Sequence, residues 1–358
     1  MNSFIERVVP TDLELDTLCG IVDEVSAPRL RGREHEAIAE AERQGSAAVD
    51  SLGRLGQKLA DLIAHRGPVG VIEIDLGKAL PRYEPIPPTP TELDSPAEHV
   101  LFPLDVMRCA IIGAAGGYSY GYSGQGNSNV CDDLMPTNKN LRPGASTRFA
   151  VNWHTEDAPY NRGPDNRLHT TCDVISFAYL RNPSADMTRV NKPDPASLRP
   201  ETLEALKKYQ FKLLTSYYQK AASSNVDTST SFVYGPDDWI RFSFARISEQ
   251  MDDYRTRGNL LPVIEELMGG LESNSRQVSS CPGDIAFIDN MRVAHARAPL
   301  KNPAKFDGSD RWLRRLGVVA GSRRPFLERF MKDPARRLVN NEQLLPYLQS
   351  LPIPHQTV

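Results

Sequence analysis

The stretch "PGDIAFIDNMRVAHARAPLKNPAKFDGSDRWLRRL", residues 282–316, decides the fold of this chain. It holds three short runs rich in aliphatic residues, and clusters of Pro, Gly, Asn and Asp separate them, a pattern typical of strands joined by turns. Four further runs of this kind precede it, at 147–156, 171–182, 230–235 and 239–248. Helical periodicity interrupts them only at 199–220 and 257–274. Many short strands with few helices predict a mainly β fold with flanking helices (α+β), a double-stranded β-helix or distorted jelly roll.

The first hundred residues differ from this pattern. Residues 11–66 repeat Ala, Leu and Ile at helical spacing, and Thr11 is placed to cap the first helix. Residues 69–76 predict a buried strand, and the Pro-rich run that follows predicts an extended surface connection. We therefore expect a single domain over 1–358, with a helical packing region at 1–100, a jelly-roll core at 101–325 and a C-terminal extension at 326–358.

The segment "GAAGGYSYGYSGQGNSN", residues 113–129, is rich in Gly, Tyr, Ser and Asn and follows a predicted helix. It lacks the Gly-Lys-Ser/Thr ending of a phosphate-binding loop, and it contains no Gly-x-Gly-x-x-Gly that opens a helix after a strand. Nucleotide binding is therefore disfavoured. We expect a mobile loop beside the functional site.

Charge and cysteine usage exclude several functions. The 42 basic and 45 acidic side chains give a net charge of −3, so no basic surplus favours nucleic acid. No run approaches the roughly 18 apolar residues of a membrane span, and the N-terminus does not resemble a signal peptide. The five cysteines are scattered and never in Cys-x-x-Cys spacing, which argues against disulfides and structural zinc. These features predict a cytoplasmic protein whose partner is a small molecule.

His154 and Glu156 form a candidate metal site. Side chains at i and i+2 of a strand share a face, so both can reach one ion while Thr155 points away. An isolated His-x-Glu is by itself more often an ordinary polar edge of a strand than a ligand pair. Among the remaining histidines, His295 is the best-placed third ligand because it lies in a strand-like segment.

Two imidazoles and one carboxylate on one face of an ion leave three octahedral positions open, as non-haem Fe(II) oxygenases require. A zinc peptidase would carry His-Glu-x-x-His on a helix, and the sequence has none. The triad therefore favours iron, with no catalytic side chains beyond the metal ligands.

Arg311 is the candidate anchor for a dicarboxylate cosubstrate. Period-two alternation in "RWLRRL" places Arg311, Leu313 and Arg315 on one face of a strand. A guanidinium meets a carboxylate with two parallel hydrogen bonds, which a lysine cannot do. The alternative is an ordinary surface ion pair with the preceding Asp310.

Three blocks, 152–160, 175–190 and 282–316, resemble the clavaminate synthase-like (TauD-like) branch of the Fe(II)/2-oxoglutarate-dependent oxygenases, which includes the arginine and asparagine 3-hydroxylases of peptide-antibiotic biosynthesis. The resemblance covers roughly residues 120–320. It implies Fe(II) as cofactor, with 2-oxoglutarate and O₂ as cosubstrates. It implies the ligands His154, Glu156 and His295.

The resemblance also implies the residues around the iron. Arg311 and Thr188 would hold the distal carboxylate of 2-oxoglutarate. Arg315 matches an arginine that receives the substrate carboxylate, and Gln125 matches a glutamine that contacts the substrate amine. Halogenases of this chemistry replace the carboxylate ligand with a small residue, so Glu156 favours hydroxylation.

One departure bears on the substrate. The arginine hydroxylases carry two acidic residues in the strand that here reads "WIRFSFARIS", and Ser243 and Ala245 occupy those places. A buried guanidinium without a carboxylate partner is costly, so we expect a neutral amino acid or a cyclic dipeptide instead of arginine, with Ser243 near it. Desaturation, epoxidation, cyclisation and a carrier-bound substrate stay open as alternatives. A metal-binding jelly roll without catalysis and a zinc hydrolase are disfavoured.

Overall fold

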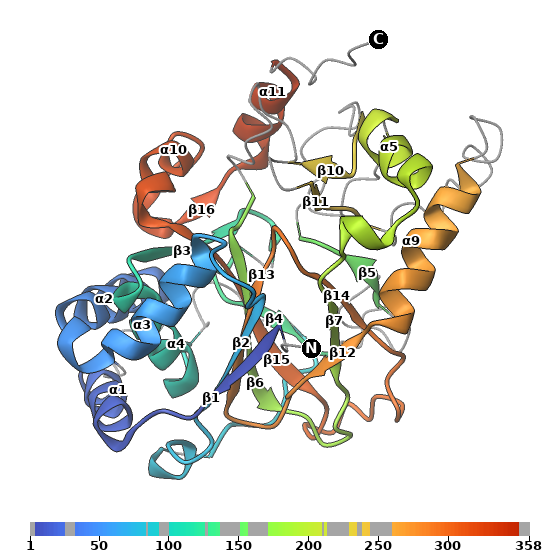
Figure 1. Cartoon of the computed structure of the whole chain (residues 1–358). Coiled ribbons are helices and arrows are strands. Elements are labelled where there is room, and N and C mark those ends of the chain that lie inside the picture. The colour runs from blue at the N-terminus through green and yellow to red at the C-terminus, as the bar shows by residue number, and fades with distance from the viewer. Residues whose placement is uncertain are drawn as a thin grey trace.

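The computed structural model describes residues 4–25, 33–83, 85–92, 100–125, 128–136, 151–156, 171–209, 211–212, 229–234, 238–243 and 260–350. Two β-sheets lie at its centre, with one group of helices beside each (Figure 1). Among the described residues, none of the helices combines the length and apolar character that crossing a bilayer requires.

The larger sheet has eight strands among the described residues. Its central strands pair antiparallel, whereas β1 joins β2, and β16 joins β3, in parallel. In spatial order they are β1 (Ile5–Val8), β2 (Val71–Asp75), β13 (Asp284–Asp289), β6 (Val174–Arg181), β15 (Trp312–Ala320), β3 (Gly117–Tyr122) and β16 (Leu338–Val339), with β4 (Asp132–Leu134) also paired to β15.

The smaller sheet has four antiparallel strands, in the order β12 (Arg276–Val278), β7 (Thr188–Asn191), β14 (Ala294–Arg297) and β5 (Val151–His154). The turn at 290–293 carries the chain from β13 in the larger sheet to β14 in the smaller one. Two short strand pairs accompany the sheets: β8 (Phe211–Lys212) with β9 (Ser229–Thr230), and β10 (Val233–Tyr234) with β11 (Trp239–Ile240).

Strand β6 shows why the larger sheet reads as a continuous apolar run. Its alternate residues Val174, Ala178 and Leu180 pack among the N-terminal helices, while Ile175, Phe177 and Tyr179 pack with residues of the smaller sheet. Both faces of the strand are therefore buried, and apolar residues occupy nearly every position.

The helices α1 (Asp12–Val25), α2 (Glu34–Ala47), α3 (Val49–Ile63) and α4 (Pro103–Ala114) cover the outer face of the larger sheet (Figure 1). The Thr11 side chain accepts from the Glu14 N–H, and Glu14 accepts from the Thr11 N–H, so the predicted cap is present as a reciprocal pair. Glycines let α2 and α4 touch: a Cβ on Gly113 would lie 2.0 Å from the Glu42 carbonyl oxygen.

The remaining helices lie elsewhere. Apolar residues of α5 (Pro200–Lys208) and α9 (Leu261–Ser273) pack with residues of the smaller sheet. Helices α10 (Arg324–Glu328) and α11 (Asn341–Ser350) follow the last long strand, together with short 3₁₀ turns at Leu80–Arg82, Pro195–Ser197, Gly321–Arg323 and Pro334–Arg336.

The predicted strands at 69–76, 171–182 and 282–297 are confirmed, as is the α+β class. Two expectations were wrong. The segment 113–129, expected to be a mobile loop, contains β3 in the larger sheet. The helix expected over 199–220 ends at Lys208, and Phe211 already belongs to β8. The helical spacing within 34–65 is confirmed, and Ala48 separates α2 from α3 there.

Strands β1 and β2 show that the first hundred residues also contribute to the larger sheet. The division of the chain into a packing region, a core and a C-terminal extension stays a prediction.

Candidate metal centre

Three side chains from distant parts of the chain meet at one end of the smaller sheet. His154 ends β5, Glu156 follows it by two residues, and His295 lies in β14, and their ligand atoms all lie within 4.8 Å of one another. The Nε2 atoms of His154 and His295 lie 3.7 and 3.6 Å from Glu156 Oε1. The structure thus brings together the three residues that the sequence singled out.

The residue between the two neighbouring donors confirms the expected alternation. Thr155 is buried, its N–H donates to the Phe242 carbonyl at 2.9 Å, and its hydroxyl accepts from the Phe242 N–H at 3.3 Å. Thr155 therefore holds the β5 end against the 238–243 segment. His154 and Glu156 are left to share the opposite face.

Both imidazoles present Nε2 to the carboxylate. His154 Nδ1 lies 2.8 Å from the Asn152 carbonyl oxygen, which can only accept, so Nδ1 carries a proton and Nε2 is the nitrogen that faces Glu156. Burial, aided by the neighbouring His154, lowers the pKa of His295 to about 4. His295 is therefore neutral at physiological pH, the form in which imidazole binds metals.

Glu156 is ionised in this environment. Burial alone would raise the pKa of its carboxyl group, but Arg315 and the two histidines outweigh burial and hold the pKa well below its usual range. The nearest cation is Arg315, whose Nη1 donates to Glu156 Oε1 at 2.7 Å. Two imidazoles and one carboxylate therefore face one point.

A small cavity opens beside Glu156 and Arg315. Arg315 Nη2 donates to Asp132 Oδ2 at 2.6 Å, and Gln125 Nε2 donates to the same oxygen at 3.4 Å. Arg315 and Gln125, the predicted contacts for the substrate carboxylate and amine, thus lie together in the cavity wall. The described lining is completed by Tyr120, Gly121, Tyr122, Val130, Cys172, Ile175, Leu316 and Gly317.

Ser243, the third predicted substrate residue, lies beside His154 and not in the described wall of this cavity. Its backbone forms an antiparallel bridge with His154, and it is not among the described residues that line the cavity. Ala245, the other half of the departure from the arginine hydroxylases, lies outside the described residues.

Arg311 is buried at the start of β15, with its side chain 8% exposed. Asp310 is not its partner, because that carboxylate accepts the backbone N–H groups of Lys305 and Phe306. Among the residues that the structure describes, Arg311 forms no ion pair, and its Nε has no hydrogen-bond partner. Burial accordingly lowers the pKa of Arg311.

Thr188 and Tyr179 belong to the same region as Arg311. The two hydroxyl groups lie 2.7 Å apart. Tyr179 is close enough to Arg311 to oppose the effect of burial on the pKa of that guanidinium. Burial raises the pKa of Tyr179 to about 12, so its hydroxyl stays protonated. A buried guanidinium beside two hydroxyls is a ready site for an anion.

Sequence reasoning missed Asp132 and Asn290. Asp132 lies in β4, whose sequence carries no strand signal, and its role depends on pairing with β15. Asn290 lies within the quoted block, yet its contacts with Glu156 come from tertiary structure alone.

No protein-family model matches this chain. It is similar to an L-ornithine/L-arginine 3-hydroxylase of Catenulispora acidiphila, 26% identical over 246 residues, which is 60% of this chain and 66% of that protein. It is also similar to the enduracididine beta-hydroxylase of Streptomyces hygroscopicus, 24% identical over 349 residues, and to clavaminate synthase 2 of Streptomyces clavuligerus, 26% identical over 340 residues. These two matches cover 89% of this chain and 94% and 93% of the relatives. The resemblance drawn from the sequence motifs is confirmed.

Solved structures show the fold. The crystal structure of the non-heme iron oxygenase OrfP in complex with Fe and alpha-ketoglutaric acid matches with a TM-score of 0.69 at 22% identity, over 93% of this chain and 99% of that chain. The complex of the same protein with Fe and L-Arg matches with a TM-score of 0.64 at 21% identity, over the same shares. The chain therefore has the jelly-roll fold of these oxygenases, as predicted.

Proposed function

We propose that this chain is an Fe(II)- and 2-oxoglutarate-dependent oxygenase that hydroxylates a free amino acid or a small amino-acid derivative. One observation carries the proposal: the His154–Glu156–His295 cluster lies beside a cavity that carries Arg315. The curated relatives that the chain resembles are named as hydroxylases of ornithine, arginine, enduracididine and lysine, and this agrees with the predicted enzyme class.

The donor set fits iron. Two imidazole Nε2 atoms and one carboxylate oxygen suit Fe(II) and leave coordination positions open for cosubstrates. When bound, Fe(II) would supply O₂ activation coupled to the oxidation of 2-oxoglutarate to succinate and CO₂. The protein's task is to hold the ligands in place and to exclude water.

Arg311 fits the distal carboxylate of 2-oxoglutarate. A buried guanidinium without an ion pair among the described residues is unfavourable unless an anion accompanies it. A carboxylate would accept two hydrogen bonds from Arg311 and one from the Thr188 or Tyr179 hydroxyl. These residues would thus bind and orient the cosubstrate.

Arg315 and Gln125 fit the two ends of an α-amino acid. Arg315 offers a guanidinium to a substrate carboxylate, while the Gln125 carboxamide oxygen and the Asp132 carboxylate offer acceptors to an ammonium group. The other described residues of the cavity wall are uncharged, among them Tyr120, Tyr122 and Ile175. This lining supports a substrate with a neutral side chain, although the named relatives act on the cationic ornithine, arginine and lysine.

The test is succinate formation by protein loaded with Fe(II) without air and then given 2-oxoglutarate and O₂. Neutral amino acids and cyclic dipeptides are screened against arginine, ornithine and lysine, with products identified by mass spectrometry. We expect succinate in step with a product that gains one oxygen atom, from a neutral substrate. Turnover of arginine alone would refute the neutral side chain but not the enzyme class.

Other products separate the alternatives. A product that loses two hydrogen atoms would identify desaturation or cyclisation at the same site, and turnover only of a carrier-bound amino acid would replace the free substrate. Absence of succinate with every compound would contradict the oxygenase and favour a metal-binding protein without catalysis. Cytoplasmic location stays a prediction.

A further inference from the structure

We propose that Asn290 is a positioning residue of the metal centre: its carboxamide holds the backbone of Glu156 and joins it to the turn that precedes His295. This inference rests on the proposed function. Asn290 Oδ1 accepts from the Glu156 N–H at 2.7 Å, and Asn290 Nδ2 donates to the Glu156 carbonyl oxygen at 3.3 Å. One side chain thus binds the backbone on both sides of the carboxylate-bearing residue.

Asn290 lies in the turn between β13 and β14, so its contacts with Glu156 link two candidate metal ligands. Asn290 comes directly after β13 and begins the turn that leads to β14 and His295. Glu156 lies just beyond the end of β5, where the strand pairing of His154 no longer fixes the backbone. Asn290 therefore ties the carboxylate ligand to the segment that carries the distal histidine.

Asn290 is itself held rigidly. Its side chain is fully buried, its N–H donates to the Asp173 carbonyl at 2.9 Å, and its Nδ2 donates to the Cys172 carbonyl at 3.0 Å. Nδ2 also lies 3.2 Å from Cys172 Sγ. Held between Glu156 and Cys172, the carboxamide has one orientation and cannot follow a displaced Glu156.

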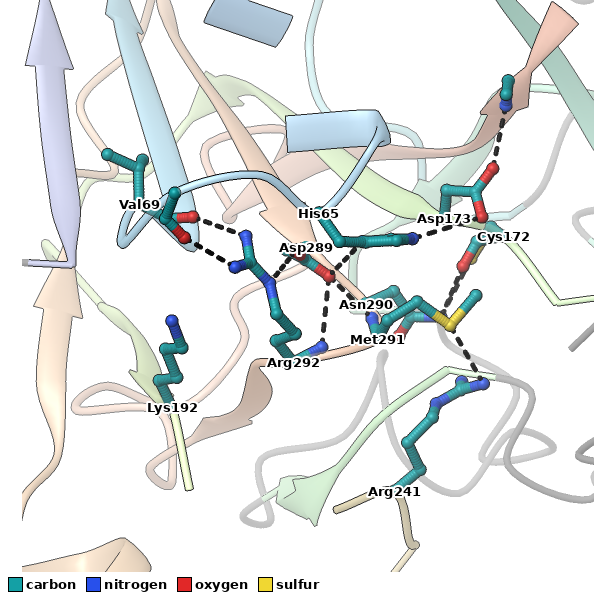
Figure 2. Close-up of polar contacts among 12 residues, drawn as sticks. His65, Val69, Cys172, Asp173, Lys192, Arg241, Asp289, Asn290, Met291 and Arg292 are labelled. Carbon is teal, nitrogen blue, oxygen red and sulfur yellow. Dashed lines mark hydrogen bonds and ion pairs between the residues drawn. The ribbon is translucent and has the colours of Figure 1, made fainter. Parts of the chain in front are cut away.

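The preceding residue anchors the turn. Asp289 accepts from the Met291 N–H at 2.9 Å and from Arg292 Nε at 2.5 Å, and His65 Nδ1 lies 3.0 Å from its carboxylate (Figure 2). Arg292 in turn donates to the carbonyls of Gly67 and Val69. The turn is thereby fastened to the segment between α3 and β2, so Asn290 is a fixed point.

The two hydrogen bonds between Asn290 and the Glu156 backbone differ in whether another group could replace Asn290. The Glu156 carbonyl also accepts from Arg241 Nη2 at 2.6 Å, so it keeps a partner without Asn290. Among the described residues, Asn290 Oδ1 is the one acceptor for the Glu156 N–H. Loss of Oδ1 leaves the partly buried N–H of the carboxylate ligand unpaired, and the backbone is then free to move.

The experiment measures metal binding directly, with Mn(II) as an air-stable substitute for Fe(II), by calorimetric titration of the full chain. We expect the dissociation constant of Asn290→Ala to rise about 10- to 100-fold, the usual effect of removing a group that orients a metal ligand. Asn290→Asp keeps an acceptor for the Glu156 N–H and is expected to lose less affinity. If Asn290→Ala does not fold, the Mn(II) dissociation constant of Asn290→Asp is compared with that of the unmodified chain instead.

Asn191→Ala is the matched control. Asn191 is also a buried asparagine, and its Nδ2 donates to the Leu271 carbonyl at the end of α9. It opposes Ala294 in the β7–β14 pair, so its side chain lies on the face of the smaller sheet opposite to that of His295. We expect it to lower the thermal midpoint while leaving the Mn(II) dissociation constant within about twofold. At saturating Fe(II), the KM for 2-oxoglutarate should stay within about twofold in Asn290→Asp, because Arg311 is untouched.

Each contrary result has its own meaning. Unchanged Mn(II) affinity in Asn290→Ala, or an equal loss in Asn191→Ala, would overturn the positioning role and leave the metal centre standing. Failure of the unmodified chain to bind Mn(II) and Fe(II) would instead overturn the proposed function, and the positioning role with it.

Discussion

His154 and His295 are directly opposed residues of the antiparallel strands β5 and β14, with ring centroids 4.2 Å apart. Opposed side chains of an antiparallel pair point to the same face, so pairing these strands is enough to bring two distant imidazoles together. A slip of one residue would turn one ring to the other face. The irregularity between His295 and Arg297 lies on one side of this pair only.

Replacing His295 with alanine should abolish Fe(II)-dependent succinate formation without unfolding the chain. The histidine supplies one of three donors, and its buried Nδ1 has no hydrogen-bond partner among the described residues, so the fold loses little. We expect at least about a 100-fold loss of activity. Succinate assay and circular dichroism check both statements, and full activity in a folded variant would refute the ligand assignment.

Replacing Arg311 with methionine should raise the KM for 2-oxoglutarate far more than that for the prime substrate. The same change removes a buried cation that has no ion pair among the described residues, so the thermal midpoint of the protein without cosubstrate should stay level or rise. Steady-state kinetics with each substrate varied, and a melting curve, measure the two effects. Equal increases in both KM values would contradict the assignment.

His65 should stabilise the fold in a pH-dependent way. Burial alone would lower its pKa, but Asp173 and Asp289 outweigh burial and raise the pKa to about 9 from an ordinary value of 6.5. Because the folded pKa lies above the unfolded one, the stabilisation is complete below pH 6.5 and disappears as the pH rises through about 9. We expect His65→Gln to lower the free energy of unfolding by on the order of 3 kcal/mol at pH 6 and by little at pH 10.

Urea unfolding at both pH values measures this difference. His35→Gln is the control, because His35 is more exposed and its nearest carboxylate, that of Glu36, is 3.9 Å away. Equal effects of His65→Gln at the two pH values would show that the His65 proton does not contribute.

Asp105→Asn should be strongly destabilising. Asp105 is fully buried in α4 and accepts from Arg108 at 2.7 Å and from Arg314 of β15. Burial alone would raise the pKa of Asp105, but Arg314 and Arg108 outweigh it and lower the pKa. The neutral amide leaves buried guanidinium charge uncompensated, at a cost of about 3–5 kcal/mol.

The exposed ion pair between Glu40 and Arg43 in α2 is the control for the buried ion pairs of Asp105. Glu40→Gln should change the free energy of unfolding by less than about 0.5 kcal/mol. Denaturant titration of both variants tests the comparison, and similar small losses would show that the buried ion pair adds no stability.

The sequence predicted strands where the pattern is local. Strands β6 and β13 are continuous apolar runs between turn residues, so their type was evident. Strand β3 was missed because its "GYSYGY" composition is that of a loop. Tertiary packing explains the glycine: a Cβ on Gly121 would lie 3.2 Å from the Asn129 carbonyl, so a larger residue would crowd the neighbouring chain.

The pairing of the candidate ligands His154 and Glu156 followed from alternation within one strand, which sequence displays directly, whereas His295 was chosen as the best-placed of the remaining histidines. The helix predicted over 199–220 was wrong because Tyr209 adopts an extended backbone, with ψ of 142°, and the chain then enters the β8–β9 pair. Asp132 and Asn290 could not be predicted, because each acts through contacts with residues far away in the sequence.

The candidate centre divides its tasks between the two sheets. The histidine donors are carried by β5 and β14 of the smaller sheet, whereas Arg315 and the tyrosines of the cavity wall come from β15 and β3 of the larger one. The residues that would bind the metal and the residues that would select the substrate can therefore be changed separately. To change which amino acid is oxidised, one can vary β3 and the neighbouring end of β15 and leave the histidine donors of β5 and β14 unchanged.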